Sequence, residues 1–359
     1  MTKSLIEKAR DMHDPSSVAS KDKKLGDLER QLATERRKNT SLNNELKRLH
    51  DENLSTSERM DLILETSDSI NAKKLHRVAK SKHKSKATAI LCANDWHAEE
   101  RIDLGDVNGI NEFNLDIAKK RIDRLWSKAV YLLDFSQHVA QIDDLVLWLG
   151  GDLINGIIAL EMEEYNFLGP SEAIMWVQDR VVEGIDHLLP HFKNITVVTS
   201  GGNHSRTVQK KRIGTWWRHS WEYLCYQNLS RYYSKNPKVS FKIEKSYHNW
   251  LDIQGRAVRF HHGDAVKFAG GIGGITIPLK RKIGQWNKAR HADLDVIGHF
   301  HQHESTWNYV ISGCLVGTNA YAIDIGAEIQ EPTQTWIVID RSHGRTVTLP
   351  IFVEEAKSI

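Results

Sequence analysis

Five short segments of this chain each end an apolar run with side chains that bind metal ions. In chain order they are Asp95-Trp96-His97, Gly151-Asp152-Leu153, Gly202-Asn203-His204, His262-Gly263-Asp264 and Gly298-His299-Phe300-His301. Carboxylate, amide and imidazole groups without a thiolate suit Mn, Fe, Zn or Ni better than Ca. Two such ions held close together hydrolyse phosphate esters. The segments therefore predict a two-metal centre.

The residues before each segment read as a buried strand. These strands are predicted at Thr88–Cys92, Leu145–Leu149, Ile195–Val198, Ala257–Phe260 and Leu294–Ile297. Amphipathic spacing predicts helices over Asn114–Ala140, Ser171–Leu189 and Ile213–Tyr233. Strand-like runs follow at Trp307–Ser312, Trp336–Asp340 and Arg345–Leu349, with a hairpin turn at Ser342–Arg345. The order favours two packed sheets with helices outside them, which would bring the strand ends to one rim.

Individual residues in these segments have the types that a two-metal centre needs. Asp95 and His97 are two apart at a strand end, so their side chains point to one face. Asp152 follows two glycines, which leave room for a turn and for ions that its carboxylate can bridge. Asn203 offers a neutral oxygen, and the adjacent His204 can face the substrate instead of a metal.

The ordered pattern resembles the calcineurin-like metallophosphoesterases, whose motifs are D-x-H, G-D-x-x, G-N-H-[ED], H-G and G-H-x-H. The resemblance implies a four-layer α/β/β/α sandwich with two divalent metal ions, Mn²⁺ being expected and Fe, Zn, Ni or Mg the alternatives. It implies one metal on Asp95, His97, Asp152 and His301, and a second on Asp152, Asn203, His262 and His299. Asp152 and His204 would be catalytic. Asp152 would bridge ions about 3.5–4 Å apart that share a hydroxide for in-line attack on phosphorus, and His204 would stabilise charge or protonate the leaving oxygen.

Three positions depart from that pattern or need assignment. Ser205 stands where Glu or Asp is usual, and that acid normally orients the neighbouring histidine, so the role of His204 is open. Asn155 replaces a frequent Asp, and we expect it to support a ligand instead of binding metal. His261 precedes His262, and we expect it to be buried in its strand.

Cationic and aromatic residues after the metal segments bear on the substrate. The predicted substrate-binding residues are Arg206, Trp217, Lys280, Arg281 and Lys282. Aromatic rings interleaved with Lys and Arg can stack bases and hold phosphates. The glycine-rich run Gly270–Gly274 and the basic run Lys73–Lys86 can add to such a surface. Core-facing aromatics and ordinary solvated charges explain the same residues, so both interpretations stay open.

These features favour a phosphodiesterase that acts on DNA or RNA, that is, a nuclease. The arrangement is similar to the SbcD-type nucleases and to phosphoesterases encoded by phages, within the shared motifs. The alternatives are a phosphomonoesterase (protein or small-molecule phosphatase), a small or cyclic nucleotide phosphodiesterase, and a non-enzymatic coiled-coil scaffold with a vestigial site. Phosphatases of this kind carry an Arg two residues after the acid of the third motif, whereas Arg206 directly follows Ser205, so the monoesterase alternative ranks lower.

The first 87 residues differ from the rest in charge and pattern. They hold 20 Lys and Arg against 14 Asp and Glu. Leucines at 3-4 spacing predict a helical coiled-coil segment over residues 1–70, namely Leu25, Leu28, Leu32, Leu42, Leu46 and Leu49, with Asn39 at a position where a buried Asn fixes register. We expect a homo-oligomer through this segment, a basic linker at 71–87 and the phosphoesterase domain at 88–355. A single solvated helix is the alternative.

Cysteine usage and hydropathy bear on the compartment. Cys92, Cys225 and Cys314 show no paired spacing, which is typical of a reducing compartment. No apolar run reaches the roughly 18 residues that span a bilayer, and the first residues lack the apolar core of a secretory signal. We expect a cytoplasmic protein that does not contact membranes.

Overall fold

The computed structural model describes residues 15–69, 85–267 and 274–355, with side chains described for residues 23–52 of the first range. The chain divides into two compact units, residues 1–81 and 82–359. The predicted basic linker lies largely outside the described residues, as do most of the Lys73–Lys86 and Gly270–Gly274 runs. The strand β1 begins at Ser85, three residues before its predicted start.

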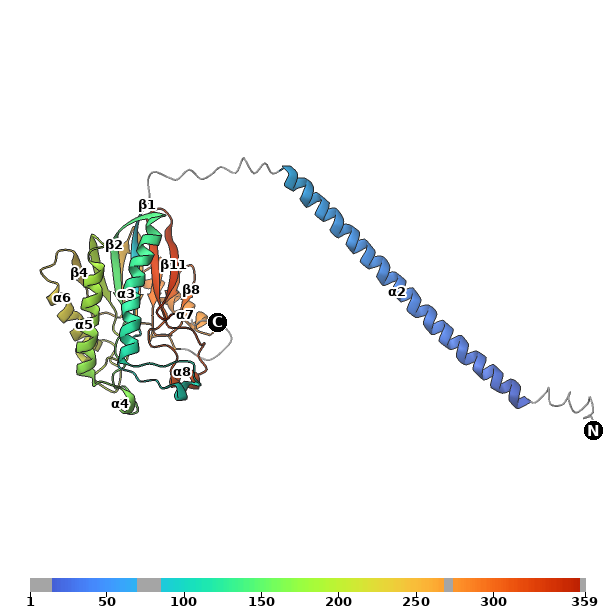
Figure 1. Cartoon of the computed structure of the whole chain (residues 1–359), viewed down its shortest axis with the longest axis horizontal. Coiled ribbons are helices and arrows are strands. Elements are labelled where there is room, and N and C mark those ends of the chain that lie inside the picture. Colours follow the sequence, from blue (N-terminus) through green and yellow to red (C-terminus); the bar gives the residue numbers. More distant parts are fainter. Residues whose placement is uncertain (1–14, 70–84, 268–273, 356–359) are drawn as a thin grey trace, which may run out of the picture. The chain divides into compact units, whose positions relative to one another are not determined.

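The described part of the first unit is one helix, α2 (Pro15–Ser69) (Figure 1). A proline at the first helical position suits the helix start, because its missing N–H has no partner there in any case. All six leucines of the predicted seam are exposed, from 46% at Leu49 to 64% at Leu46. The helix is therefore observed as expected, while its pairing into a coiled coil stays a prediction.

The second unit is a mixed α/β structure with two sheets. The six-stranded sheet has the order β11-β10-β1-β2-β3-β4, in which β1 to β4 run parallel and β10 and β11 are antiparallel. Its strands are β1 (Ser85–Ala93), β2 (Ala140–Leu149), β3 (Asn194–Thr199), β4 (Val239–Lys242), β10 (Thr333–Asp340) and β11 (Gly344–Phe352). The hairpin predicted at Ser342–Arg345 is confirmed, because Asp340 pairs with Gly344 across it.

The five-stranded sheet has the order β5-β6-β7-β9-β8, with β6, β7 and β9 parallel. Its strands are β5 (Asn249–Ile253), β6 (Arg256–His261), β7 (Leu294–Ile297), β8 (Glu304–Ser305) and β9 (Tyr309–Ile311). The helical elements of this unit are η2 (Leu104–Val107), α3 (Leu115–Gln137), α4 (Met162–Tyr165), α5 (Pro170–Leu188), η3 (Trp216–His219), α6 (Trp221–Tyr232), α7 (Thr276–Ala289) and α8 (Ala320–Asp324).

Apolar side chains on both faces of each sheet produce a layered core. In β1, Ala89 and Leu91 belong to the cluster shared with α3 and α5, whereas Ile90 and Cys92 belong to the cluster between the two sheets. A third cluster joins β7 and β9 to α7 through Ile297 and neighbours. The helices α3 and α5 lie side by side over the six-stranded sheet (Figure 1). The expected two sheets with helices outside are thus present.

Local sequence signals account for the helix limits. Asn114 caps α3 by accepting a hydrogen bond from the backbone N–H of Ile117 (3.0 Å), and Pro170 opens α5. The prediction of a single helix over Ile213–Tyr233 is wrong, because the extended backbone of Ser220 separates η3 from α6. The hydroxyl of Ser220 caps α6 by accepting a hydrogen bond from the backbone N–H of Tyr223 (3.2 Å). Within the described residues, no helix is both long and apolar enough to span a membrane.

Candidate metal centre

The predicted ligands lie where five strands of the two sheets end. Backbone hydrogen bonds join these ends: the N–H of Asp95 donates to the carbonyl of Gly151 (2.9 Å), and that of Gly298 to His262 (2.8 Å). The loops after β1, β2, β3, β6 and β7 therefore share one rim. The expectation that residues scattered over about two hundred positions would meet agrees with this geometry.

The backbone at this rim is unusual. Seven non-glycine residues in the described ranges have φ between +44° and +72°, and five of them are predicted ligands: Asp95, His97, Asp152, His299 and His301. Left-handed backbone is disfavoured for residues with a Cβ, and such conformations concentrate at functional sites. The sharp turn after each strand points these side chains into the rim.

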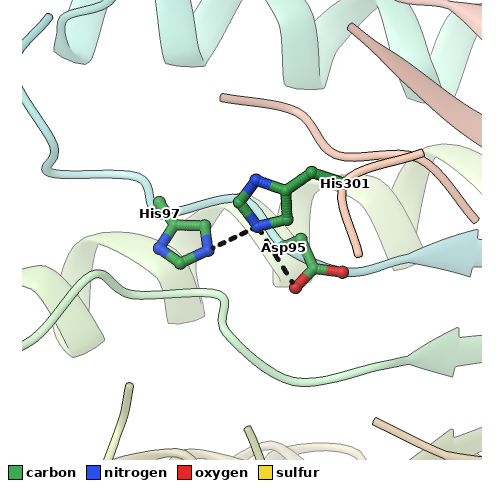
Figure 2. Close-up of side chains that lie close together, drawn as sticks. All are labelled: Asp95, His97 and His301. Atoms are coloured by element: carbon green, nitrogen blue, oxygen red, sulfur yellow. Dashed lines mark hydrogen bonds and ion pairs between the residues drawn. The ribbon is translucent and has the colours of Figure 1, made fainter. Parts of the chain in front are cut away.

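One group of donors consists of Asp95, His97 and His301, which lie close together in Figure 2. The Nε2 atoms of the two histidines are 3.2 Å apart, and the Nε2 of His301 is 3.7 Å from Oδ1 of Asp95. Two imidazole nitrogens and a carboxylate oxygen facing one point form a donor set that a divalent ion accepts.

A second group surrounds Asp152, which is buried at 1% exposure. Its Oδ2 lies 2.8 Å from Nε2 of His262, and that nitrogen lies 3.2 Å from Oδ1 of Asn203. His299 belongs to the same group, and Asp152 also joins His97 and His204 in a third group. Asp152 thus belongs to the second and third groups, and His97 links the third group to the first. The bridging position predicted for Asp152 lies between them.

Hydrogen bonds fix which nitrogen each histidine presents to the centre. The Nδ1 of His97 lies 3.0 Å from Oδ1 of Asn155, and that of His262 lies 2.9 Å from the carbonyl oxygen of Gly150. Both partners accept, so Nδ1–H donates in each ring. Nε2 of His97 keeps its lone pair toward the centre, whereas Nε2 of His262 faces the carboxylate of Asp152. A second partner of this kind is the usual way in which proteins orient a metal-binding histidine. Asn155 therefore orients His97, which is a predicted ligand.

A buried carboxylate oxygen tests whether metals fit this rim. Oδ2 of Asp95 accepts the N–H of His299 (2.8 Å). Oδ1 of the same carboxylate is buried and has no hydrogen-bond partner among the described residues. An unsatisfied buried acceptor is costly, and a cation placed between it and the two Nε2 atoms would satisfy it. The donor set therefore fits a bound divalent ion.

Without a metal, the rim contains one ion pair, Asp152 with His262, and neutral imidazoles beside it. Burial would raise the pKa of Asp152, but His262, His204 and His97 together hold it well below its usual range. Burial would lower the pKa of His262, but Asp152, Asp95 and Asp264 together raise it to about 10. Burial lowers the pKa of His299 to about 3 and that of His301 to about 4. The neutral imidazoles are the form that binds metals.

His204 is held through its Nδ1 by a backbone carbonyl, as His262 is, and its backbone also contacts Asp152. Its Nδ1 lies 2.9 Å from the carbonyl oxygen of Asn155, and its backbone N–H donates to Oδ1 of Asp152 (2.7 Å). The Nε2 atom is therefore the free end of the ring. Ser205, which stands in place of an acid, bonds through its hydroxyl to Ser220 (3.0 Å). A backbone carbonyl thus orients His204.

Two buried glutamates that sequence reasoning missed hold the ligand loops together. The carboxylate of Glu222, on α6, accepts the N–H of Leu153 (2.6 Å) and of Gly202 (2.9 Å), which neighbour Asp152 and Asn203. The carboxylate of Glu99 accepts the N–H groups of Asn155 and Gly156. Both side chains are fully buried. An acidic residue on the buried face of an amphipathic helix was the available signal for Glu222.

A cavity of about 500 Å³ adjoins the centre at Asn203. Of the predicted substrate-binding residues, Arg206 and Lys282 line it. The guanidinium of Arg206 donates to the carbonyl of Asn203 (2.7 Å). Trp217 lies outside the lining, with the cations of Arg218 and Lys245 over its ring, and Lys280 and Arg281 are exposed positions of α7 outside it. The adjacent Trp216 lines the cavity instead.

Comparison with solved structures gives distant likenesses. A Streptococcus pneumoniae TIGR4 protein, described as a predicted phosphoesterase, is 10% identical, covers 74% of this chain and 98% of its own, and gives a TM-score of 0.30. Vps29 of Entamoeba histolytica, complexed with Zn²⁺, is 12% identical over 73% of this chain and 99% of its own (TM-score 0.30). A hypothetical protein of Pyrococcus horikoshii OT3 is 10% identical over 74% of this chain and 88% of its own (TM-score 0.36).

No family model matches the chain, and no curated protein matches it. The three structural likenesses are too low in score to support an argument about function. The functional assignment therefore rests on the geometry of the rim.

Proposed function

We propose that the chain is a metal-dependent phosphoesterase of the calcineurin-like class. The observation that carries the proposal is the meeting of donors from five strand ends around Asp152. Oriented imidazoles complete that rim, together with a buried oxygen of Asp95 that accepts no hydrogen bond from the part of the chain that the structure describes. When bound, two divalent ions supply Lewis acidity at the phosphoryl oxygens and lower the pKa of coordinated water.

The chain's own residues supply the remaining parts of a hydrolytic site. Because Nδ1 of His204 is held by the carbonyl of Asn155, its Nε2 can carry a proton to the leaving oxygen. Arg206, fixed to the carbonyl of Asn203, places a cation beside the rim. Glu222 keeps the loops of Asp152 and Asn203 at a constant separation.

We further propose that the substrate is a phosphodiester of DNA or RNA. A cavity beside Asn203 with Arg206 and Lys282 in its wall suits a second substituent on the scissile phosphate. The basic excess of residues 1–87 agrees with a polyanionic partner. Phosphomonoester hydrolysis, hydrolysis of a small or cyclic nucleotide, and a scaffold with a vestigial site are the competing functions.

The test compares bis-p-nitrophenyl phosphate with p-nitrophenyl phosphate, and single- with double-stranded DNA, in the presence of Mn²⁺, Fe²⁺, Zn²⁺, Ni²⁺ or Mg²⁺. We expect the diester and DNA to be hydrolysed, and Asp152→Asn to lose this activity. The matched control is Asp179→Asn, which makes the same change at an exposed position of α5.

The possible results separate the competing functions. Release of phosphate from the monoester alone, with DNA intact, would overturn the diester assignment and leave the phosphoesterase class. Absence of turnover with every metal, together with absence of metal binding by calorimetry, would favour the scaffold.

A further inference from the structure

The cavity beside Asn203 has three aromatic walls. Trp216 comes from η3, Tyr247 from the loop before β5, and Trp286 from α7. The volume of about 500 Å³ lies within the roughly 300–1,000 Å³ of pockets that hold small molecules. All three residues are partly exposed and line the cavity.

Contacts tie these walls to the loops that carry the predicted ligands. The ring of Trp216 lies directly on Gly201, where an added Cβ would overlap it. The hydroxyl of Tyr247 accepts hydrogen bonds from the N–H groups of Gly263 and Ala265 (3.1 Å each), just after His262. The cavity therefore has a fixed position relative to the metal centre, and a group attached to a phosphate on that centre would extend into it.

The lining of the cavity carries mostly positive charge. The described lining includes five Lys and Arg residues and one acid, Asp264, which pairs with Lys211. A lipid chain would use the rings and leave the cations unpaired, whereas a sugar phosphate would use the cations and leave the rings uncovered. A nucleotide unit uses both, because its base stacks on aromatic side chains and its flanking phosphate pairs with Lys and Arg.

We propose that this cavity binds the base of the nucleotide whose phosphate is hydrolysed, with Trp216 and Trp286 as its stacking surfaces. The inference rests on the proposed function and deepens it by naming the substrate class at the same site. The cations around the cavity, among them Arg206, Lys211 and Lys282, hold the next phosphate of the strand.

A binding experiment tests the cavity without metals. In the presence of EDTA, calorimetry compares thymidine 5′-monophosphate with deoxyribose 5-phosphate, which lacks the base. We expect the nucleotide to bind at least about tenfold more tightly, since stacking on an aromatic side chain provides that difference. Trp216→Ala and Trp286→Ala should abolish it. Trp307→Ala, at a ring that is 89% exposed outside this cavity, should retain it.

A kinetic experiment measures the same preference in the metal-loaded protein. Thymidine 5′-(p-nitrophenyl) phosphate and 1,2-dideoxyribose 5-(p-nitrophenyl) phosphate have the same leaving group and nearly the same sugar, and they differ in the base. We expect kcat/KM to favour the thymidine ester by about tenfold or more. Val208→Trp, which fills the cavity from the loop after β3, should bring the ratio toward one even if the tryptophan variants do not fold.

The failures of the two proposals are distinguishable. If both esters are hydrolysed at equal kcat/KM, or the base adds nothing to binding, the base-binding cavity is wrong while the phosphoesterase stands. If neither ester is hydrolysed but the nucleotide still binds more tightly than the sugar phosphate, the cavity stands and the proposed function fails.

Discussion

Gly202→Ala is a single substitution that should displace Asp152 directly. Gly202 precedes the ligand Asn203 and packs against Asp152. An added Cβ would lie 2.7 Å from Cγ of Asp152 and closer still to its Oδ1 and backbone nitrogen. The backbone of Gly202 does not have a positive φ, so alanine is tolerated there except for this overlap.

The size of the effect follows from the overlap. The carboxyl carbon of Asp152 must move from 2.7 Å to the 3.4 Å or more of an ordinary van der Waals contact. The Glu222 carboxylate bonds the N–H groups of Leu153 and Gly202, so the two loops cannot separate freely. Forcing a group into a packed site costs about 1–3 kcal/mol. Displacing a catalytic group by about 1 Å can cost about 10²-fold in rate.

We therefore expect Gly202→Ala to lower the free energy of unfolding by about 1–3 kcal/mol and kcat/KM on bis-p-nitrophenyl phosphate by about 10²-fold. Chemical denaturation and steady-state kinetics measure the two quantities, and calorimetry measures metal affinity, which should fall as well. Gly214→Ala is the matched control, since nothing lies within 4 Å of its added Cβ. If Gly202→Ala retained wild-type metal affinity and activity, the close approach of Gly202 to Asp152 would not control this centre.

Three further predictions address the leaving group, pH and assembly. His204→Gln should lower the rate of hydrolysis of an unactivated alkyl diester by about 10²–10⁴-fold. The rate with a p-nitrophenyl ester should fall far less, because a good leaving group needs no proton. Equal losses with both substrates would contradict the proton-donating role, and His187→Gln, at an exposed position of α5, is the control. Burial raises the pKa of Glu100 from 4.5 to about 7, so the folded state holds this proton more tightly and loses stability as the pH rises from 4.5 to 7. Glu100→Gln should remove about 3 kcal/mol of that decline, as measured by denaturation at pH 5 and pH 8; an unchanged pH profile would contradict it. We propose that the exposed leucine seam of α2 joins copies of the chain, so removing residues 1–70 should reduce the mass measured by light scattering, and an unchanged mass would exclude α2 as the assembly element.

The strand ends could be predicted because two signals coincide there. Runs such as Leu145–Leu149 are apolar on both faces, as buried parallel strands must be, and each run is followed within three residues by glycine, aspartate or histidine. These two signals locate β1, β3, β6 and β7 to within three residues, whereas β2 begins at Ala140, five residues before its predicted start. Once these five elements are parallel or neighbouring, the meeting of their ends follows from sheet geometry.

The supporting residues could not be predicted in the same way. Glu222 reaches Gly202 only because η3 and the break at Ser220 return the chain to the rim, and such irregular segments have no periodicity to read. Trp216 lines the cavity and the adjacent Trp217 does not, and helical spacing cannot distinguish them because it does not apply to a short 3₁₀ turn. Tyr247 lies before β5 in a loop whose path only the folded chain defines.

The left-handed backbone at Asp95, His97, Asp152, His299 and His301 restricts how this rim can change over time. Those conformations tolerate glycine, asparagine, aspartate and histidine and reject β-branched residues, whatever chemistry takes place there. A relative that lacks the proposed metal centre would still need residues that tolerate these turns, so asparagine or glycine would replace the aspartates and histidines there.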